Sequence, residues 1–264
     1  VEVAEGESIH MAYMLTTTGA TAFLGEDSVG GIEIAIAERG AIEGHEINLS
    51  GEDSGCSAEG GQDAATKVTA DESIVAIIGT NCSGAATAAL PTISAAGLIM
   101  CSPSNTAPAL TDKDGTWAPG YFRAAHNDLF QGRVAAEFAY NELGARTAAT
   151  IHDGSPYADQ LQIVFASTFV ELGGTVTFQG AVNVGDTDMR AVLTSAAADT
   201  PDVLYFPIFE PEGPFIVAQS SEIDGLENTT LFGADGLLTA SFASNSGENA
   251  DGMYLSGPYL SGSA

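Results

Sequence analysis

The feature that most constrains the fold of this chain is a regular alternation of short apolar runs with longer segments of helical periodicity. The apolar runs predict strands at residues 9–15, 45–50, 74–79, 98–101, 148–152, 175–182, 203–209, 230–233 and 253–256. The segments between them predict helices near residues 26–39, 60–71, 84–96, 128–143, 157–172, 187–198 and 212–224. Strands that alternate with helices are typical of mostly parallel sheets with helices on both faces. The pattern therefore predicts an α/β protein.

The alternation falls into two blocks. The first block runs to about Arg123, and the second begins after residues 124–127. Just before this boundary, residues 111–120 are rich in Gly, Pro and Asp, as is usual in an exposed loop. A chain of 264 residues is long enough for one large domain or two small ones. We therefore predict two α/β lobes.

The chain is strongly acidic, with 7 Lys and Arg against 35 Asp and Glu and a formal net charge of −28. A protein of this charge repels nucleic acid and anionic membrane surfaces, so we expect neither as a partner. Only two lysines are present, Lys67 and Lys113. The acidity fits either solubility outside the cell or a saline habitat, and the sequence does not distinguish the two.

A membrane-spanning helix requires a long apolar segment, and a signal peptide requires a basic region followed by an apolar one. The longest apolar runs, such as residues 74–78, are too short to cross a bilayer, so we expect no membrane insertion of this segment. Residues 1–5 lack the basic and apolar regions of a signal peptide. If the protein is exported, we therefore expect this sequence to be the mature or trimmed form, with its signal peptide removed.

Motifs for catalysis and metal binding are missing from the sequence. It contains no Gly-x-Ser-x-Gly, Walker, His-Glu-x-x-His or Gly-x-Gly-x-x-Gly motif. His152 and Asp153 follow a predicted strand, but no nucleophile of recognisable context accompanies them. Residues 112–115 resemble a fragment of a calcium loop and are better explained as a turn. We expect no enzyme activity, no metal and no cofactor.

Three cysteines are present, and none forms a Cys-x-x-Cys pair. Cys56 follows the predicted strand 45–50, and Cys82 follows the predicted strand 74–79. If those strands are neighbours, both thiols lie at the carboxyl edge of the sheet and can reach bonding distance. Cys101 lies in an apolar run and is predicted to be a buried thiol. One bridge and one buried thiol suit an oxidising compartment.

Polar clusters follow two of the predicted strands. Residues 82–84 precede a helix, so Ser83 is predicted to cap it, and an anion bound there would meet free amides and the positive end of the helix dipole. Residues 102–106 follow the next strand and open into a turn. Ordinary capping and turn chemistry is the blander explanation of both clusters, and the pattern favours it slightly. The pattern alone leaves both interpretations open.

With these clusters the chain resembles the leucine/isoleucine/valine-binding proteins, which are type I periplasmic solute-binding proteins of ABC importers. Specific matches include Gly-Thr-Asn-Cys-Ser at residues 79–83 and Gly-Ala-Asp-Gly at residues 233–236. The similarity spans nearly the whole chain in the order of the family. The matching segments are residues 25–27, 31–36, 52–56, 78–83, 102–111, 122–123, 128–132, 151–157, 185–188, 205–212 and 233–236.

The resemblance implies a fold of two doubly wound α/β lobes with parallel sheets, joined by a hinge of three crossovers. Residues 1–123 together with 252–264 would form the N-terminal lobe, and residues 124–251 the C-terminal lobe. Members of the family continue well past the strand that corresponds to residues 253–256. The resemblance therefore implies that the C-terminal part of the first lobe is missing from this sequence.

The resemblance also implies a ligand held in a cleft between the lobes. Ser83 and Thr106 would hold the α-carboxylate of an amino acid. Asp235 would receive its α-ammonium, together with the backbone carbonyl of Asn105. A zwitterion requires such a pairing of anion donors with a carboxylate acceptor, with apolar walls for its side chain.

The walls of the cleft and one covalent bond follow from the same resemblance. Tyr157 and Phe209 would line the cleft from the second lobe, and Leu24 from the first. The resemblance pairs Cys56 with Cys82 in a disulfide.

Two departures from the family pattern bear on the ligand. Glu210 stands beside Phe209 where the family often has an aromatic residue, and it either favours a ligand with an extra amine or amide or faces solvent. Leu24 replaces a larger aromatic residue and makes the pocket roomier. Relatives of this fold bind amides, urea and aromatic acids, so these ligands are alternatives to a branched-chain amino acid.

The sequence therefore predicts a solute-binding protein that captures a small amino acid for the membrane subunits of an ABC permease. It would be periplasmic or extracellular, either free or lipid-anchored. The alternative is the ligand-binding domain of a sensor or receptor with the same fold.

Overall fold

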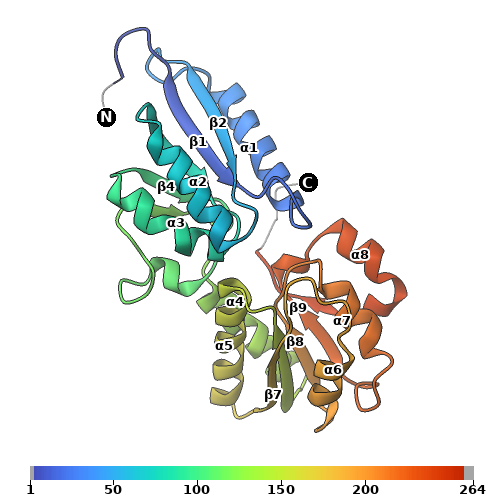
Figure 1. Cartoon of the computed structure of the whole chain (residues 1–264). Helices are drawn as coiled ribbons and strands as arrows, with labels where there is room; N and C mark the ends of the chain where they lie inside the picture. The colour runs from blue at the N-terminus through green and yellow to red at the C-terminus, as the bar shows by residue number, and fades with distance from the viewer. Residues whose placement is uncertain (1–2, 259–264) are drawn as a thin grey trace. The chain divides into compact units, whose positions relative to one another are not determined.

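The computed structural model describes residues 3–258. It contains two compact α/β units, which are divided in the chain between Ala125 and His126, and Figure 1 labels their α-helices and several of their strands. The predicted architecture of two α/β lobes with parallel sheets is confirmed. No helix within residues 3–258 combines the length and the apolar character that a membrane span requires.

The first unit is built on a five-stranded parallel sheet with the strand order β2-β1-β3-β4-β5. Its elements in chain order are β1 (Ile9–Leu15), α1 (Phe23–Arg39), β2 (Ile47–Asp53), α2 (Ala58–Ala70), β3 (Ile74–Gly79), α3 (Ser83–Ala95), β4 (Ile99–Ser102), the short 3-10 helix η1 (Pro108–Thr111) and β5 (Tyr121–Arg123).

The second unit is built on another five-stranded parallel sheet, with the order β10-β9-β8-β6-β7. Counted from β6 along the chain, this order is the same as that of the first sheet. Its elements are α4 (Asp128–Glu137), the π-helical turn η2 (Phe138–Glu142), β6 (Thr147–His152), α5 (Pro156–Glu171), β7 (Thr175–Ala181), α6 (Arg190–Ala197), β8 (Val203–Phe206), α7 (Gly213–Ser220), β9 (Thr230–Gly233), η3 (Asp235–Leu237), α8 (Ala240–Ser246), η4 (Gly247–Ala250) and β10 (Tyr254–Leu255).

Helices lie on both faces of each sheet (Figure 1). In the first unit α2 and α3 pack together on one face, and α1 lies on the other. In the second unit α4 and α5 pack together on one face, and α6 and α7 lie on the other. Connections between parallel strands are almost always right-handed, so connections that run to opposite sides of β1 and of β6 place their helices on opposite faces of the sheet.

The cores of the two units differ in composition. The first core consists largely of Ala, Ile, Leu and Met side chains from the sheet, α2 and α3. The second core is rich in aromatic residues. In it, the ring of Phe165 stacks on Tyr205 with a centroid distance of 4.1 Å and lies nearly parallel to Phe169 at 5.7 Å.

Gly132 allows α4 to pack closely against α5. A β-carbon at this position would lie 2.7 Å from Cγ1 of Val164, which is closer than carbon atoms approach. The residue before it, Gln131, is also buried, with 6% exposure.

One strand, β5, and one α-helix, α8, are not predicted by the sequence pattern. β5 has only three residues, so it carries no alternation. α8 buries a single apolar side chain, Phe242, and therefore has no apolar periodicity. Its N-cap, Thr239, accepts a hydrogen bond from the amide of Phe242 and is the sequence signal that marks this helix.

The structure corrects the prediction for the last strand. The resemblance places residues 252–264 in the first lobe, but Tyr254 and Leu255 form β10 and pair in parallel with β9 of the second sheet. Leu255 also packs against the second core, which explains why this strand belongs there. Residues 259–264 of the same prediction lie outside the described residues.

The structure also corrects the prediction that Cys101 is buried, since its side chain is exposed. β4 is a two-faced strand in which Met100 and Ser102 are buried while Ile99 and Cys101 are exposed. Ile99 is 51% exposed, and Phe122 of the neighbouring β5 is 58% exposed. Among the described residues, this face of the first sheet is therefore uncovered at β4 and β5.

Candidate functional site

Each sheet has a point where the direction of the crossovers reverses, between β1 and β3 in the first unit and between β6 and β8 in the second. Ligands of open α/β sheets bind near the carboxyl ends of the strands at such a point. The predicted site residues all follow strands of the two sheets: Leu24 follows β1, Ser83 follows β3, Asn105 and Thr106 follow β4, Tyr157 follows β6, Phe209 and Glu210 follow β8, and Asp235 follows β9.

Ser83 is the first residue of α3 and does not cap this helix as predicted. Cys82 occupies the N-cap position, and no side chain bonds a first-turn amide. Instead, Oγ of Ser83 accepts a hydrogen bond of 3.3 Å from the amide of Ala107. This bond ties the start of α3 to the loop after β4. The hydroxyl proton of Ser83 has no acceptor within residues 3–258.

Thr106 lies in the same loop and is only 3% exposed. Its hydroxyl makes no hydrogen bond with any residue that the structure describes. The first amides of α3 lack partners inside the helix and add partial positive charge. The carboxyl edge of the first sheet therefore presents two hydroxyl donors beside a helix start, which together favour an anion.

Asn105 is fully buried and is bonded through its side chain, whose Oδ1 accepts a hydrogen bond of 3.2 Å from the hydroxyl of Tyr121. Its backbone carbonyl, the predicted acceptor for an ammonium group, accepts a hydrogen bond of 3.3 Å from the guanidinium of Arg123. A positive charge at this carbonyl opposes the approach of a second cation. The role of Asn105 stays a prediction, and this contact weakens it.

Leu24 lies in the first turn of α1 and is half-buried. Its backbone carbonyl accepts a hydrogen bond of 3.0 Å from Nδ2 of Asn81, while Oδ1 of Asn81 accepts one of 2.9 Å from the amide of Thr16. Asn81 thus holds the loop after β1 and the start of α1 in place. No role for Asn81 follows from the sequence pattern, although this residue belongs to the matching segment 78–83.

The predicted disulfide between Cys56 and Cys82 is present, with their Cα atoms 5.1 Å apart. The strands that precede them, β2 and β3, are not neighbours as the sequence argument supposed, because β1 lies between them. The bridge therefore passes over the carboxyl end of β1, where Oγ1 of Thr16 lies 3.8 Å from Sγ of Cys82. It joins the loops after the two strands that lie on either side of β1.

In the second unit, Asp235 is half-exposed just after β9. Its Oδ1 accepts two hydrogen bonds, one of 2.7 Å from Nε2 of Gln131 and one of 2.8 Å from the hydroxyl of Tyr157. Its Oδ2 has no hydrogen-bond partner within residues 3–258. One carboxylate oxygen is therefore held by the protein, and the other remains available to a cation.

Tyr157 and Phe209 form an aromatic pair beside Asp235, with ring centroids 5.0 Å apart. Burial raises the pKa of Tyr157 well above its usual value, and the negative charges of Asp235 and Asp128 raise it further. Its hydroxyl therefore stays protonated and donates to Asp235.

A glycine is required next to Asp235. A β-carbon on Gly236 would lie 2.7 Å from the backbone oxygen of Ile208 and 3.3 Å from the hydroxyl of Tyr157. Its backbone amide donates a hydrogen bond of 3.2 Å to that hydroxyl. Close packing at Gly236 thus keeps the acid and the aromatic pair together.

Glu210 is 8% exposed and does not face solvent. Its Oε2 accepts hydrogen bonds of 2.7 Å from Oγ1 of Thr239 and 2.8 Å from Oγ of Ser241, at the start of α8. An acid is favourable there because of the amides of the first turn. Anchoring α8 accounts for this carboxylate without a ligand.

Glu212 is a further buried acid of this unit, with 1% exposure. Burial raises its pKa, the hydrogen bond of 2.7 Å from the amide of Gly185 opposes the rise, and the negative charges of Asp153 and Asp186 add to it. Glu212, Glu210 and Asp235 all lie in the segments that follow β8 and β9. These segments of the second unit are therefore rich in carboxylates.

The other polar motifs have structural partners. Nδ1 of His152 accepts a hydrogen bond of 3.1 Å from the amide of Gly154, in the turn that leads to α5. Residues 112–115 form a turn in which Oδ1 of Asp112 accepts the amide of Asp114 at 3.0 Å. Within residues 3–258 no group of three or more His, Cys, Asp or Glu side chains is arranged to hold a metal ion.

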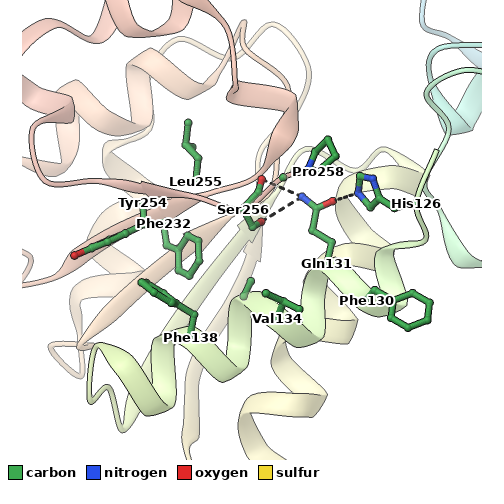
Figure 2. Close-up of a pocket in the computed structure, with 12 residues that line it drawn as sticks. His126, Phe130, Gln131, Val134, Phe138, Phe232, Tyr254, Leu255, Ser256 and Pro258 are labelled. Carbon is green, nitrogen blue, oxygen red and sulfur yellow. Dashed lines mark hydrogen bonds between the residues drawn. The ribbon is translucent and has the colours of Figure 1, made fainter. Parts of the chain in front are cut away.

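Gln131 is a second site residue, besides Asn81, that the sequence does not predict. The segment 128–132 carries part of the family resemblance, but no role follows for its glutamine. Figure 2 shows the side chain of Gln131 reaching from α4 toward Ser256 and His126, to both of which it is bonded.

A family model described as "Periplasmic binding protein" matches residues 8–264. Among curated relatives, a Leu/Ile/Val-binding protein of Rhizobium johnstonii is 29% identical over 228 residues. That match covers 85% of this chain and 60% of the relative, so the chain spans less than two thirds of the relative's length.

Solved structures of the same kind are similar. A leucine-binding protein from Thermotoga maritima superimposes with a TM-score of 0.87 at 28% identity, over 93% of this chain and 69% of that one. A branched-chain amino acid transporter substrate-binding protein from Streptococcus pneumoniae, in complex with isoleucine, gives a TM-score of 0.81 at 25% identity, over 94% of this chain and 70% of that one.

Proposed function

Because the chain belongs to the periplasmic binding protein family, we propose that it is an extracytoplasmic solute-binding protein that captures a small amino acid. The amino acid would be of the branched-chain or aliphatic type, bound by its zwitterionic head. The ligand would pass to the membrane subunits of an ABC permease. Its relatives include a Leu/Ile/Val-binding protein and a branched-chain amino acid transporter substrate-binding protein, which supports this proposal.

The observation that carries the proposal is the opposite chemistry of the two carboxyl edges. The first unit offers the hydroxyls of Ser83 and Thr106 and the start of α3, which suit a carboxylate. The second unit offers Oδ2 of Asp235, which suits an ammonium group. An α-amino acid carries both charges, so the chemistry of each edge would suit one end of such a ligand.

The side chain of the ligand would meet apolar surroundings. Tyr157 and Phe209 supply an aromatic wall, and Leu24 supplies an aliphatic one. Such walls stabilise an aliphatic side chain by removing it from water. Because Glu210 is bonded to the start of α8, it adds no demand for an amine or amide on the ligand.

A thermal-shift screen tests the ligand class, because a ligand that binds only the folded state raises the melting temperature. L-leucine, L-isoleucine and L-valine should raise it, by an amount that corresponds to about 2.7 kcal/mol at a hundredfold excess over Kd. D-leucine, 4-methylpentanoate, which lacks the ammonium, and leucinamide, which lacks the carboxylate, should have much smaller effects. Stabilisation by benzoate or urea, with none by any amino acid, would contradict the proposed ligand class.

A further inference from the structure

Gln131 lies at the centre of a hydrogen-bond network behind Asp235. Its Nε2 donates to Oδ1 of Asp235 at 2.7 Å and to the backbone oxygen and Oγ of Ser256, both at 3.2 Å. Its Oε1 is bonded to Nε2 of His126. Every polar atom of the side chain therefore has a partner (Figure 2).

The surroundings of this network are mostly apolar. Gln131 lines a groove with a volume of about 390 Å³ between α4, β9 and β10, whose apolar members are Phe130, Val134, Ala135, Phe138, Phe232, Tyr254, Leu255 and Pro258. A polar side chain with 6% exposure is costly in such a place unless its hydrogen bonds are made. An apolar side chain of similar shape would fill the same space without that cost.

The bond to Asp235 has a specific geometric effect. The carboxylate of an aspartate rotates easily about its last torsion, so either oxygen can face a ligand. Gln131 and Tyr157 both donate to Oδ1, and this selects Oδ2 as the oxygen left for a ligand. The hydrogen bonds that Gln131 donates to Ser256 also tie the segment after β10 to this arrangement.

We infer that Gln131 is a positioning residue for ligand binding: it orients Asp235 so that Oδ2 is presented to the ammonium group of the ligand. The inference rests on the proposed function, since it assigns to Asp235 the ammonium of an amino acid. It predicts that Gln131 matters for ligands that carry an ammonium and not for those that lack one.

Calorimetric titration of the full chain with L-leucine and with 4-methylpentanoate tests this prediction. In Gln131→Met, the affinity for L-leucine should fall about tenfold or more, the usual size for a hydrogen bond to a charged group. The affinity for 4-methylpentanoate should change much less. Equal losses for both probes, or no loss for L-leucine, would overturn the inference.

Gln219→Met is the matched control. Gln219 is a buried glutamine of the same unit, with 8% exposure, and its hydrogen bonds of 2.7 Å to the backbone oxygen of Thr187 and 2.6 Å from the amide of Met189 hold a loop. Its substitution removes structural hydrogen bonds without touching Asp235. It should lower the melting temperature and leave the ratio of the two affinities unchanged.

A second measurement works on the ligand-free protein and separates the inference from the proposed function. In ¹H–¹⁵N NMR spectra, Asp235→Ala should shift the side-chain amide of Gln131 and speed its hydrogen exchange, while that of Gln219 stays unchanged. If wild-type protein binds no amino acid but this shift occurs, the proposed function fails and the orienting contact stands. If the Gln131 amide does not respond, the inference fails whatever the ligand is.

Discussion

The two units of this molecule share one strand order and differ in the chemistry at their carboxyl edges. In the first unit the loops after β3 and β4 carry hydroxyl groups, and the start of α3 adds amides. In the second unit the loops after β8 and β9 carry the carboxylates of Glu210, Glu212 and Asp235. The common topology determines where polar groups gather, and the residues of a few short loops determine whether that place favours an anion or a cation.

The units also differ in how their sheets are covered. The aromatic core of the second unit includes residues from both faces of its sheet. In the first unit, α2 and α3 pack tightly on one face, whereas α1 leaves a cavity of about 470 Å³ over β1, β2 and β3. Ile99 and Phe122 are exposed further along that sheet. The first unit is therefore the one in which local stability should depend on extra restraints such as the disulfide.

The largest expected effect concerns Asp235, at the carboxyl edge of the second sheet. Asp235→Ala should weaken binding of L-leucine by about 2–5 kcal/mol, because the ammonium group loses its charged partner. By the rule of tenfold per about 1.4 kcal/mol, this is some tens to thousands of fold. The affinity for 4-methylpentanoate should be retained, since this probe has no ammonium. Isothermal titration calorimetry measures both.

Asp251→Ala is the control for this variant, because it removes an exposed acid from the same unit. It should leave both affinities unchanged. An Asp235→Ala protein with unchanged affinity for L-leucine would show that the ammonium binds elsewhere, and the contrast between the two edges would lose its functional meaning.

The next effect concerns the stability of the first unit. The disulfide joins residues separated by 26 positions, and its removal in Cys56→Ser/Cys82→Ser should cost about 3 kcal/mol in the loop-entropy model. Hydrogen exchange followed by mass spectrometry should show faster exchange in β1, β2 and β3, with β6 and β8 unchanged. Equal acceleration in both units would mean that they do not unfold separately.

Cys101→Ser is the matched control, since Cys101 is outside the bridge and exposed. It should leave the exchange of both units unchanged. Thiol titration of unreduced, unfolded wild-type protein should detect one free thiol, and three would contradict the disulfide.

Much of this fold is predictable from the sequence, because parallel strands buried on both faces appear as apolar runs. β8, which is buried at all four positions, is such a strand. The prediction fails where burial is one-sided or the element is short. Ile99 and Cys101 are apolar but lie on the open face of β4, and α8 has a single buried apolar side chain, Phe242.

The candidate site is only partly predictable, for a related reason. Residues that follow the strands, such as Ser83 and Asp235, are placed by topology and by the family resemblance. The partner of a polar side chain depends on segments distant in the sequence. Glu210 is bonded to Thr239 on a helix that the pattern does not predict, and Gln131 reaches Asp235 across 104 positions.

A smaller effect is expected at Thr106, at the carboxyl edge of the first sheet. Thr106→Ala should weaken L-leucine binding by about 1–3 kcal/mol, because one donor to the carboxylate is lost while Ser83 and the amides of α3 remain. Leucinamide, which has no carboxylate, should bind the variant and the wild type alike. Thr116→Ala, an exposed threonine of the same unit, is the control. A loss as large for leucinamide as for L-leucine would mean that Thr106 supports the fold of the loop rather than the anion.

The smallest expected effect is a change of stability with pH at Glu212. Because the folded state raises the pKa of this acid, its ionisation destabilises the protein above that pKa. Glu212→Gln should therefore be more stable than wild type at neutral pH, by about 1 kcal/mol or less, since its amide oxygen can still accept the hydrogen bond from Gly185. The advantage should shrink as the pH falls through the raised pKa and be absent below the ordinary value of 4.5. Urea unfolding across this pH range measures it, with Glu248→Gln as the exposed control. An advantage independent of pH would show that the charge of Glu212 is not its cause, and the acidity of the second unit would then carry no cost in stability at this position.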